Sequence, residues 1–138
     1  MQITARKITD IQPYGKNAKK HPEDQVTKIA DSIREFGFNQ PVVVDKAGVI
    51  IVGHGRFFAA SLLGLDEIPV LELDLDEEKA KAYRLADNKL NESAWDMELV
   101  VAELKELSVA MIDLTGFDRS LILDNTEKNN SVPATPVW

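Results

Sequence analysis

A glycine-rich turn at residues 53–56 is the segment of this sequence best suited to bind an anion. Gly53-His54-Gly55-Arg56 separates a β-branched apolar run from a short segment that is typical of a helix. The start of a helix leaves backbone N–H groups unpaired and carries about half a positive charge. Glycines let the backbone approach a bulky anion, Arg56 adds a forked cation, and His54 adds a further donor. The turn therefore predicts a phosphate site, and a plain strand-to-helix turn with a solvated Arg56 is the alternative.

The elements that must position this turn are predicted from hydrophobic periodicity. Short β-branched runs favour strands over residues 2–8 and 68–73 and a hairpin formed by residues 41–44 and 49–52. A helix is expected over residues 57–63, ending at Gly64. A longer helix over residues 22–36 ends at Gly37. Its apolar stripe has helical spacing and consists of Val26, Ile29, Ala30, Ile33 and Phe36.

The second half of the chain is predicted to be mainly helical. Asp76 is a good N-cap for a helix over residues 77–90, with Ala80, Tyr83 and Leu90 at apolar spacing, and Asp96 precedes another helix. A connection over residues 112–117 and a short helix over 118–123 follow. Periodicity ends at residue 125. We therefore expect an α+β fold with a small mixed sheet, one domain over residues 1–124, and a tail or linker over residues 125–138.

Composition excludes several classes of protein. The 138 residues contain no Cys, which rules out disulfide scaffolds, thiolate metal sites and cysteine nucleophiles. No apolar run approaches the ~18 residues of a membrane span, so we expect a cytoplasmic protein without a membrane partner. The net charge is −7, but residues 1–56 carry nine Lys or Arg and six Asp or Glu, a net of +3. That half can receive a phosphate, although it is a weak platform for long DNA.

Three segments in the same order resemble the signatures of the ParB/sulfiredoxin superfamily. Residues 37–44, Gly-Phe-Asn-Gln-Pro-Val-Val-Val, resemble the first signature. The turn at residues 53–56 resembles the second, and Leu-Ala-Asp-Asn-Lys-Leu at 85–90 resembles the third. The resemblance covers roughly residues 1–120. It is strongest to the ParB-like N-terminal domains of phage and bacterial DNA methyltransferases, which share Gly-His-Gly-Arg, Ala-Asp-Asn-x-Leu and Trp-Asp.

The resemblance implies a ParB/sulfiredoxin-like fold, a nucleotide and a metal. Gly53 and Arg56 match residues that contact the CTP phosphates in ParB proteins, and Gln40 matches a residue that lines the nucleotide pocket. The residues expected to bind the nucleotide or its phosphates are Gln40, Gly53, His54, Gly55 and Arg56. Asp87 and Asn88 match the pair that holds Mg²⁺ beside the triphosphate, and hard oxygen ligands suit that ion. A helix end at Asp87 and Asn88, and an extended linker at Gln40, are the alternatives.

Two departures from the family pattern concern catalysis. His54 stands where ParB proteins have a Glu implicated in hydrolysis, and Gly55 replaces the first Arg of the turn. Phosphate binding therefore carries over in reduced form, whereas ParB-type CTP hydrolysis stays open. Sulfiredoxin chemistry is excluded because that enzyme uses a catalytic Cys in this turn. No catalytic residue is assigned from the sequence.

Three functions remain open at this stage. The first is a domain that binds CTP or ATP in a DNA modification, partition or phage DNA-processing system. The second is an enzyme of the same fold, either a metal-dependent nuclease or a small-molecule kinase. The third is a non-catalytic partner module for a DNA methyltransferase. ParB proteins have a helix-turn-helix DNA-binding domain after this one. Too little of this chain remains to hold such a domain, so DNA contact is expected to be indirect or weak. Homodimer formation, and whether the gene continues past Trp138, stay open.

Overall fold

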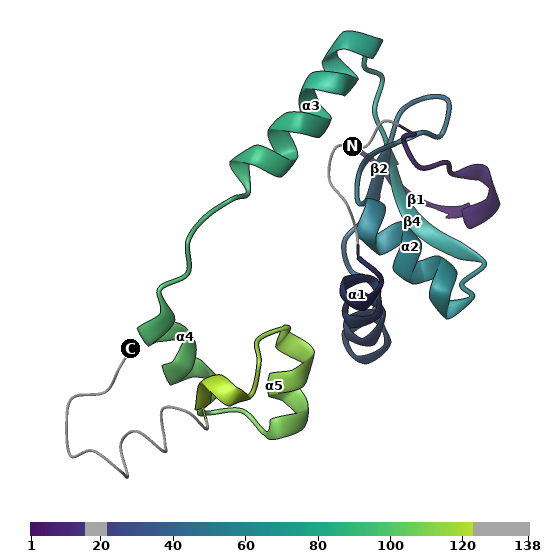
Figure 1. Ribbon diagram of the computed structural model, residues 1–138. Coiled ribbons are helices and arrows are strands. Elements are labelled where there is room, and N and C mark those ends of the chain that lie inside the picture. Colours follow the sequence, from purple (N-terminus) through teal and green to yellow (C-terminus); the bar gives the residue numbers. More distant parts are fainter. Residues whose placement is uncertain (16–21, 123–138) are drawn as a thin grey trace, which may run out of the picture. The chain divides into compact units, whose positions relative to one another are not determined.

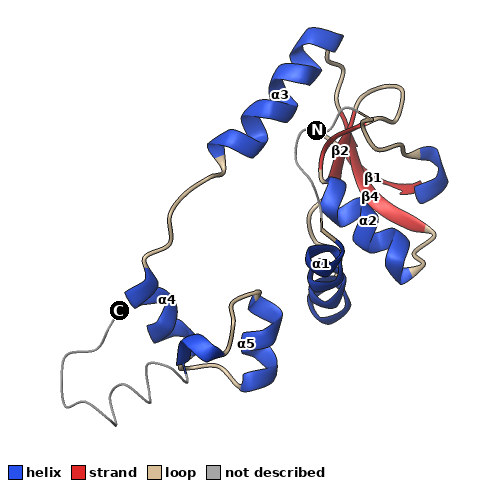
Figure 2. Cartoon of the chain, in the orientation of Figure 1, coloured by secondary structure: helices blue, strands red, loops and turns tan. Residues whose placement is uncertain are grey.

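A four-stranded mixed sheet forms the framework of the first 92 residues in this computed structural model, which describes residues 1–15 and 22–122 (Figure 2). The strand order is β1-β4-β2-β3. β4 pairs antiparallel with β1 and parallel with β2, and β2 pairs antiparallel with β3. The four predicted strands are confirmed to within one residue at each end. Their bounds are Ile3–Lys7 for β1, Val42–Val44 for β2, Ile50–Val52 for β3 and Glu67–Glu72 for β4.

Three helices accompany the sheet. They are α1 at Glu23–Phe36, α2 at His54–Leu63 and α3 at Glu77–Leu90, and a short 3₁₀ helix, η1, lies at Ile8–Asp10. α1 packs against α2 (Figure 1), and α3 lies against the edge strand β3. The predicted bounds of α3 are confirmed, and α1 begins one residue later than predicted, with Pro22 as its N-cap residue. α2 begins three residues earlier than predicted, because Gly53 adopts a left-handed φ of 108° and lets the helix start directly after it.

Alternation along the short strands divides the core between the two faces of the sheet. Val42 and Val44 point to the face covered by α2, and Val43 points to the other face. The larger cluster consists of Ile11, Val42, Val44, Ile50, Phe57, Ala60, Ile68 and Val70. On the opposite face, Ala80 of α3 joins Val43 and Ile51 in a smaller cluster. The β-hairpin and the start of α2, which carry residues 53–56, are therefore held by packing on both faces.

The buried positions of α3 differ from those expected. Ala80 is buried as predicted, but Tyr83 is 39% exposed and Leu90 is 81% exposed. The second buried residue of the helix is Arg84. Because the charged Arg84 lies on the face of α3 that packs on the sheet, the spacing of apolar residues in the sequence indicates the wrong face of this helix.

The chain divides into two units, Met1–Glu92 and Ser93–Trp138. The described part of the second unit holds α4 at Met97–Leu104 and α5 at Val109–Thr115. The predicted connection over residues 112–117 is wrong, because the Ser108 side chain caps a helix that runs through most of it. The predicted boundary at residue 124 stays a prediction, and the expected tail over 125–138 lies outside the described residues. No helix among residues 1–15 and 22–122 has the length and apolar character needed to cross a membrane.

Candidate functional site

The turn between β3 and α2 places the start of a helix at the floor of a pocket. Gly53 is the N-cap residue, and His54, Gly55 and Arg56 form the first helical turn. Within the described residues, the backbone N–H groups of Gly55 and Arg56 donate to no acceptor. A Cβ atom on residue 53 would lie 2.9 Å from Nη2 of Arg56 and 3.3 Å from Cα of Val42. Glycine is therefore required here both for its positive φ and for the space beside Arg56.

Arg56 is held at the pocket by the backbone of the neighbouring strand. Its Nη2 donates to the carbonyl oxygen of Pro41 at 2.9 Å. Its Nε is buried and has no acceptor among the described residues. Partial burial lowers the pKa of Arg56, and the negative charge of Asp87 acts in the opposite direction. Arg56 is thus a positioned cation whose donors are only partly satisfied by the protein.

His54 makes a hydrogen bond to a segment distant in sequence. The ring is buried, and its Nε2 accepts a hydrogen bond from the backbone N–H of Tyr14 at 3.0 Å. That nitrogen is therefore an acceptor, and the donor role expected of His54 toward a ligand stays a prediction. The bond joins the segment after η1 to the first turn of α2, which are 40 residues apart in sequence. His54 lines the pocket and also ties two parts of the fold together.

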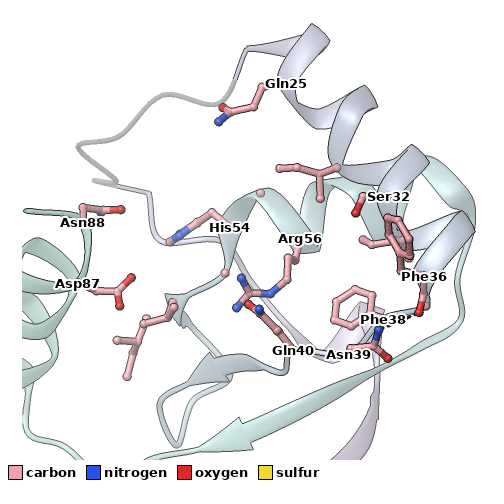
Figure 3. Close-up of a pocket in the computed structure, with 17 residues that line it drawn as sticks. Gln25, Ser32, Phe36, Phe38, Asn39, Gln40, His54, Arg56, Asp87 and Asn88 are labelled. Atoms are coloured by element: carbon pink, nitrogen blue, oxygen red, sulfur yellow. Dashed lines mark hydrogen bonds between the residues drawn. The ribbon is translucent and has the colours of Figure 1, made fainter. Parts of the chain in front are cut away.

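The predicted metal pair lies on α3, across the pocket from the turn. Figure 3 shows the carboxylate of Asp87 facing the guanidinium of Arg56, with Asn88 beside it on the same helix. The amide nitrogen of Asn88 donates to the carbonyl oxygen of Arg84 at 3.1 Å. The Asp87 carboxylate accepts from Asn91 at 3.3 Å. Asn88 therefore directs its nitrogen to its own helix, which leaves its amide oxygen for another partner.

The seven residues predicted to bind nucleotide or metal all line one cavity of about 460 Å³. They are Gln40, Gly53, His54, Gly55, Arg56, Asp87 and Asn88. The volume lies in the range that is usual for small-molecule sites. The three predicted segments therefore meet at one cavity, and the binding roles of their residues stay predictions.

The opposite wall of the pocket comes from α1 and the residues just after it, and was not predicted. Ile29, Ile33 and Phe36 line it together with Phe38. Figure 3 shows Phe36 and Phe38 on this side of the pocket. Ile29, Ile33 and Phe36 belong to the apolar stripe identified from the sequence, yet Ile29 and Ile33 are only half-buried and Phe36 is 56% exposed. The polar residues of this wall are Gln25, Ser32 and Asn39. An apolar wall with a few polar groups, next to a cationic turn, is suited to a ligand that has both a ring and an anionic group.

Comparison with known families covers most of the described chain. A family model described as the ParB N-terminal domain matches residues 1–89. A ParB-like nuclease domain-containing protein, YnaK, from Escherichia coli strain K12 is 40% identical over 83 residues, which are 59% of this chain and 95% of that protein. A probable chromosome-partitioning protein ParB from Rickettsia bellii is 28% identical over 130 residues. Those residues are 89% of this chain and 45% of the relative, so the chain spans less than half the length of that protein.

Solved structures show the same fold. The chromosome-partitioning protein ParB from Caulobacter crescentus, truncated at its C-terminus and complexed with CTP-gamma-S, has a TM-score of 0.74 and 21% identity. The match covers 88% of this chain and 75% of that one. Sulfiredoxin from Arabidopsis thaliana has a TM-score of 0.52 and 21% identity, covering 60% of this chain and 97% of sulfiredoxin. The predicted ParB/sulfiredoxin-like fold is confirmed.

Proposed function

Because this chain belongs to the ParB N-terminal domain family, we propose that its pocket binds a nucleoside triphosphate, with Mg²⁺, in a system that partitions or modifies DNA. The observation that carries the proposal is the convergence of three groups on one cavity. These are the open backbone amides at the start of α2, the guanidinium of Arg56, and the Asp87–Asn88 pair. The amides and the guanidinium suit phosphate oxygens, and the Asp87–Asn88 pair suits the metal ion bound to them.

The phosphates would lie at the turn. The amides of Gly55 and Arg56 and the positive end of α2 favour a negatively charged oxygen there. Arg56 is fixed by Pro41, and its buried Nε has no acceptor within the described part of the chain. A buried donor is costly when unpaired, so an anion that supplies an acceptor would stabilise this arrangement.

The donor set on α3 fits Mg²⁺. Asp87 offers a carboxylate oxygen, and Asn88 offers an amide oxygen while its nitrogen is bound to Arg84. Mg²⁺ commonly takes one or two protein oxygens and completes its shell with phosphate oxygens and water. When bound, the ion would offset the charge of the phosphates. The described residues group no three His, Asp or Glu side chains, so the phosphates themselves would have to supply further ligands.

The base would lie against α1. Phe36 and Phe38 offer aromatic surface, and Ser32, Asn39 and Gln40 offer polar groups. The related Caulobacter structure contains a CTP analogue, which makes CTP the first nucleotide to examine and ATP the second. Hydrolysis is not part of the proposal, because Nε2 of His54 already accepts from Tyr14 and is not free to act as a base.

Titration calorimetry with CTP and ATP, with and without Mg²⁺, tests this proposal. Wild-type protein is expected to bind one nucleotide more tightly when Mg²⁺ is present. Arg56→Ala removes the fixed cation and is expected to weaken binding about 10- to 100-fold, since hydrogen bonds to charged groups contribute about 1.5–3 kcal/mol.

The matched control is Arg34→Ala, which removes the same charge from the solvent-facing side of α1, where Arg34 pairs with Asp31. This variant is expected to bind like wild type. Absence of binding by wild-type protein to both nucleotides would refute the proposal. Equal effects of the two substitutions would show that net charge, not the position of Arg56, governs binding.

A metal-dependent nuclease is a second candidate, since the Escherichia coli relative is described as a nuclease domain protein. Such an enzyme commonly uses two metal ions bridged by carboxylates. Among the described residues that line the pocket, Asp87 is the single carboxylate. Plasmid cleavage that requires Mg²⁺ and disappears in Asp87→Asn would favour this candidate over simple nucleotide binding.

A further inference from the structure

A buried arginine on α3 makes contacts outside the pocket. Arg84 is 7% exposed, and its Nε donates to the carbonyl oxygen of Ile50 at 2.9 Å. Its guanidinium carbon lies 3.8 Å from the centre of the Tyr14 ring, and its Nη2 lies 4.0 Å from Oδ2 of Asp45. A buried cation is costly unless it is partnered, so these contacts define one preferred position for the side chain.

Arg84 is the main anchor of α3 on the sheet. Ala80 and Arg84 are the two buried residues of this helix, and Ala80 offers only a methyl group. The partners of Arg84 are themselves fixed. Ile50 belongs to β3, which leads directly into the turn at Gly53, and Asp45 accepts hydrogen bonds from two backbone amides of the β2–β3 turn, those of Ala47 and Val49, at 2.9 Å each. The placement of α3 against the hairpin therefore depends on this side chain.

Tyr14 connects the same anchor to the start of α2. Its ring lies under the guanidinium of Arg84, and its backbone N–H donates to Nε2 of His54 at 3.0 Å. One residue therefore contacts both α3 and the first turn of α2. The two walls of the pocket that carry Asp87 and Arg56 are linked behind the pocket through Arg84, Tyr14 and His54.

The position of the predicted metal pair follows from this link. Asp87 and Asn88 lie three and four residues after Arg84 on the same helix, and the Asn88 amide nitrogen binds the Arg84 carbonyl oxygen at 3.1 Å. Displacement of Arg84 would move both side chains relative to Arg56. Arg84 does not itself line the pocket, so its effect on a ligand must be indirect.

We propose that Arg84 and Tyr14 form a positioning bracket that sets the Asp87–Asn88 pair against the turn at residues 53–56. The bracket determines the gain in nucleotide affinity that Mg²⁺ provides, and this part of the inference rests on the proposed function. Neither residue is a ligand. Residues that orient metal ligands typically change metal affinity about 10- to 100-fold when replaced, and a similar loss is expected here.

Arg84→Met tests the bracket, because methionine keeps much of the side-chain length but has no N–H donor and no charge. Lys81→Met is the matched control on the same helix, where Lys81 is half-exposed and pairs with Glu77. The first readout is hydrogen exchange over residues 77–90 in the ligand-free protein. Arg84→Met is expected to speed exchange in α3 while strands β1 and β4 stay protected, and Lys81→Met is expected to match wild type.

The second readout is nucleotide affinity with and without Mg²⁺. In the presence of Mg²⁺, Arg84→Met is expected to bind nucleotide about 10- to 100-fold more weakly than wild type. In the absence of Mg²⁺, the two proteins are expected to have the same affinity. A general loss of structure would lower both affinities together. The bracket is refuted if exchange in α3 is the same in both methionine variants, or if Arg84→Met retains the full gain from Mg²⁺.

Tyr14 supplies an independent test should Arg84→Met fail to fold. Tyr14→Phe keeps the ring under the guanidinium and is expected to behave like wild type in both readouts. Tyr14→Leu removes the ring but keeps the backbone N–H that binds His54, and is expected to reproduce the faster exchange of α3. Equal behaviour of these two variants would overturn the role assigned to the ring. Wild-type protein that binds no nucleotide would refute the proposed function, while the exchange comparison would still decide whether the bracket exists.

Discussion

At the scale of single residues, Gly53 and the side chain of Arg56 occupy adjoining space, so a change at one affects the position of the other. The positive φ of Gly53 starts α2 at His54, and the absence of a side chain leaves room for Nη2 of Arg56 beside the carbonyl of Pro41. A larger residue at position 53 would compete with the guanidinium for the same space. The glycine therefore determines where the cation lies as well as where the helix begins.

Replacing Gly53 by alanine separates these two effects. The φ of 108° is unfavourable for alanine, and we expect a stability loss of about 1–2 kcal/mol in urea unfolding. The new Cβ would also lie 2.9 Å from Nη2 of Arg56, so the guanidinium must move and nucleotide affinity should fall.

Gly64→Ala is the control for the cost of the backbone conformation. Gly64 has a φ of 71° and nothing within 4 Å of the added Cβ. It is expected to lose a similar amount of stability without any loss of nucleotide affinity. If Gly53→Ala bound nucleotide as well as Gly64→Ala does, the position of Arg56 would not matter for binding.

At the scale of elements, α3 combines a strong start with a weak apolar face. The side chain of Asp76 accepts from the backbone N–H of Lys79 at 2.7 Å, which satisfies one of the free amides at the start of the helix. Beyond the cap, Ala80 and Arg84 are its buried residues. The helix therefore depends on its cap and on a few polar contacts more than on apolar packing.

Loss of the α3 cap should be measurable. Asp76→Ala is expected to lower the free energy of unfolding by about 1 kcal/mol, because an amide of the first turn loses its acceptor. Asp74→Ala removes a nearby carboxylate that is 76% exposed and pairs with Lys46 on the surface, and it should change stability by less than about 0.5 kcal/mol. Urea unfolding followed by circular dichroism measures both. Equal losses would mean that local charge, not the cap, explains the effect.

Elements were predicted well where their signals are local. Strand bounds, the cap at Asp76 and the glycine stop of α1 follow from β-branched runs, capping residues and positive-φ glycines, which act within a few residues. The apolar faces were predicted less well. The stripe of α1 lines the pocket and stays half-exposed, and a buried Arg84 replaces the expected apolar contact of α3. The burial of Arg84 depends on partners distant in sequence, Tyr14 and Ile50, which periodicity does not reveal.

The site was predicted in the same uneven way. Residues of the three signatures line one cavity. These segments could be found from the sequence because each signature is a local pattern of a few residues. The contact of His54 with Tyr14 was not predicted, since Tyr14 lies 40 residues earlier and the bond is to its backbone. The contribution of α1 was missed for a similar reason: an apolar residue that lines a cavity has the same sequence pattern as one that fills a core.

At the scale of the whole molecule, the pocket belongs to the first unit. Both hydrophobic clusters of the sheet lie within residues 1–92, and the second unit has its own buried residues, Val101, Leu104 and Ile112. The described residues that line the pocket also lie in the first unit. The two units therefore have separate cores, and the pocket needs residues from only one of them.

A truncated chain of residues 1–92 is therefore expected to fold and to keep its affinity for nucleotide. Thermal unfolding should show one cooperative transition close to that of the full chain, and calorimetry should give an affinity within a factor of about three. A chain of residues 1–124 is the control. If residues 1–124 folded and residues 1–92 did not, the sequence-based boundary at 124 would describe the smallest stable domain.

The contacts along β3 also affect whether a strand of another molecule can pair with this edge of the sheet. Gln12 pairs with the outer edge of this strand through the amide of Ile50, and Arg84 takes the carbonyl of the same residue. Because both backbone groups of Ile50 are occupied, this edge is a poorer template for a strand from another molecule. Among the described strands, β1 keeps the remaining outer edge, and it is only five residues long. The contacts of Gln12 and Arg84 at Ile50 thereby disfavour strand addition beside the turn that leads into α2.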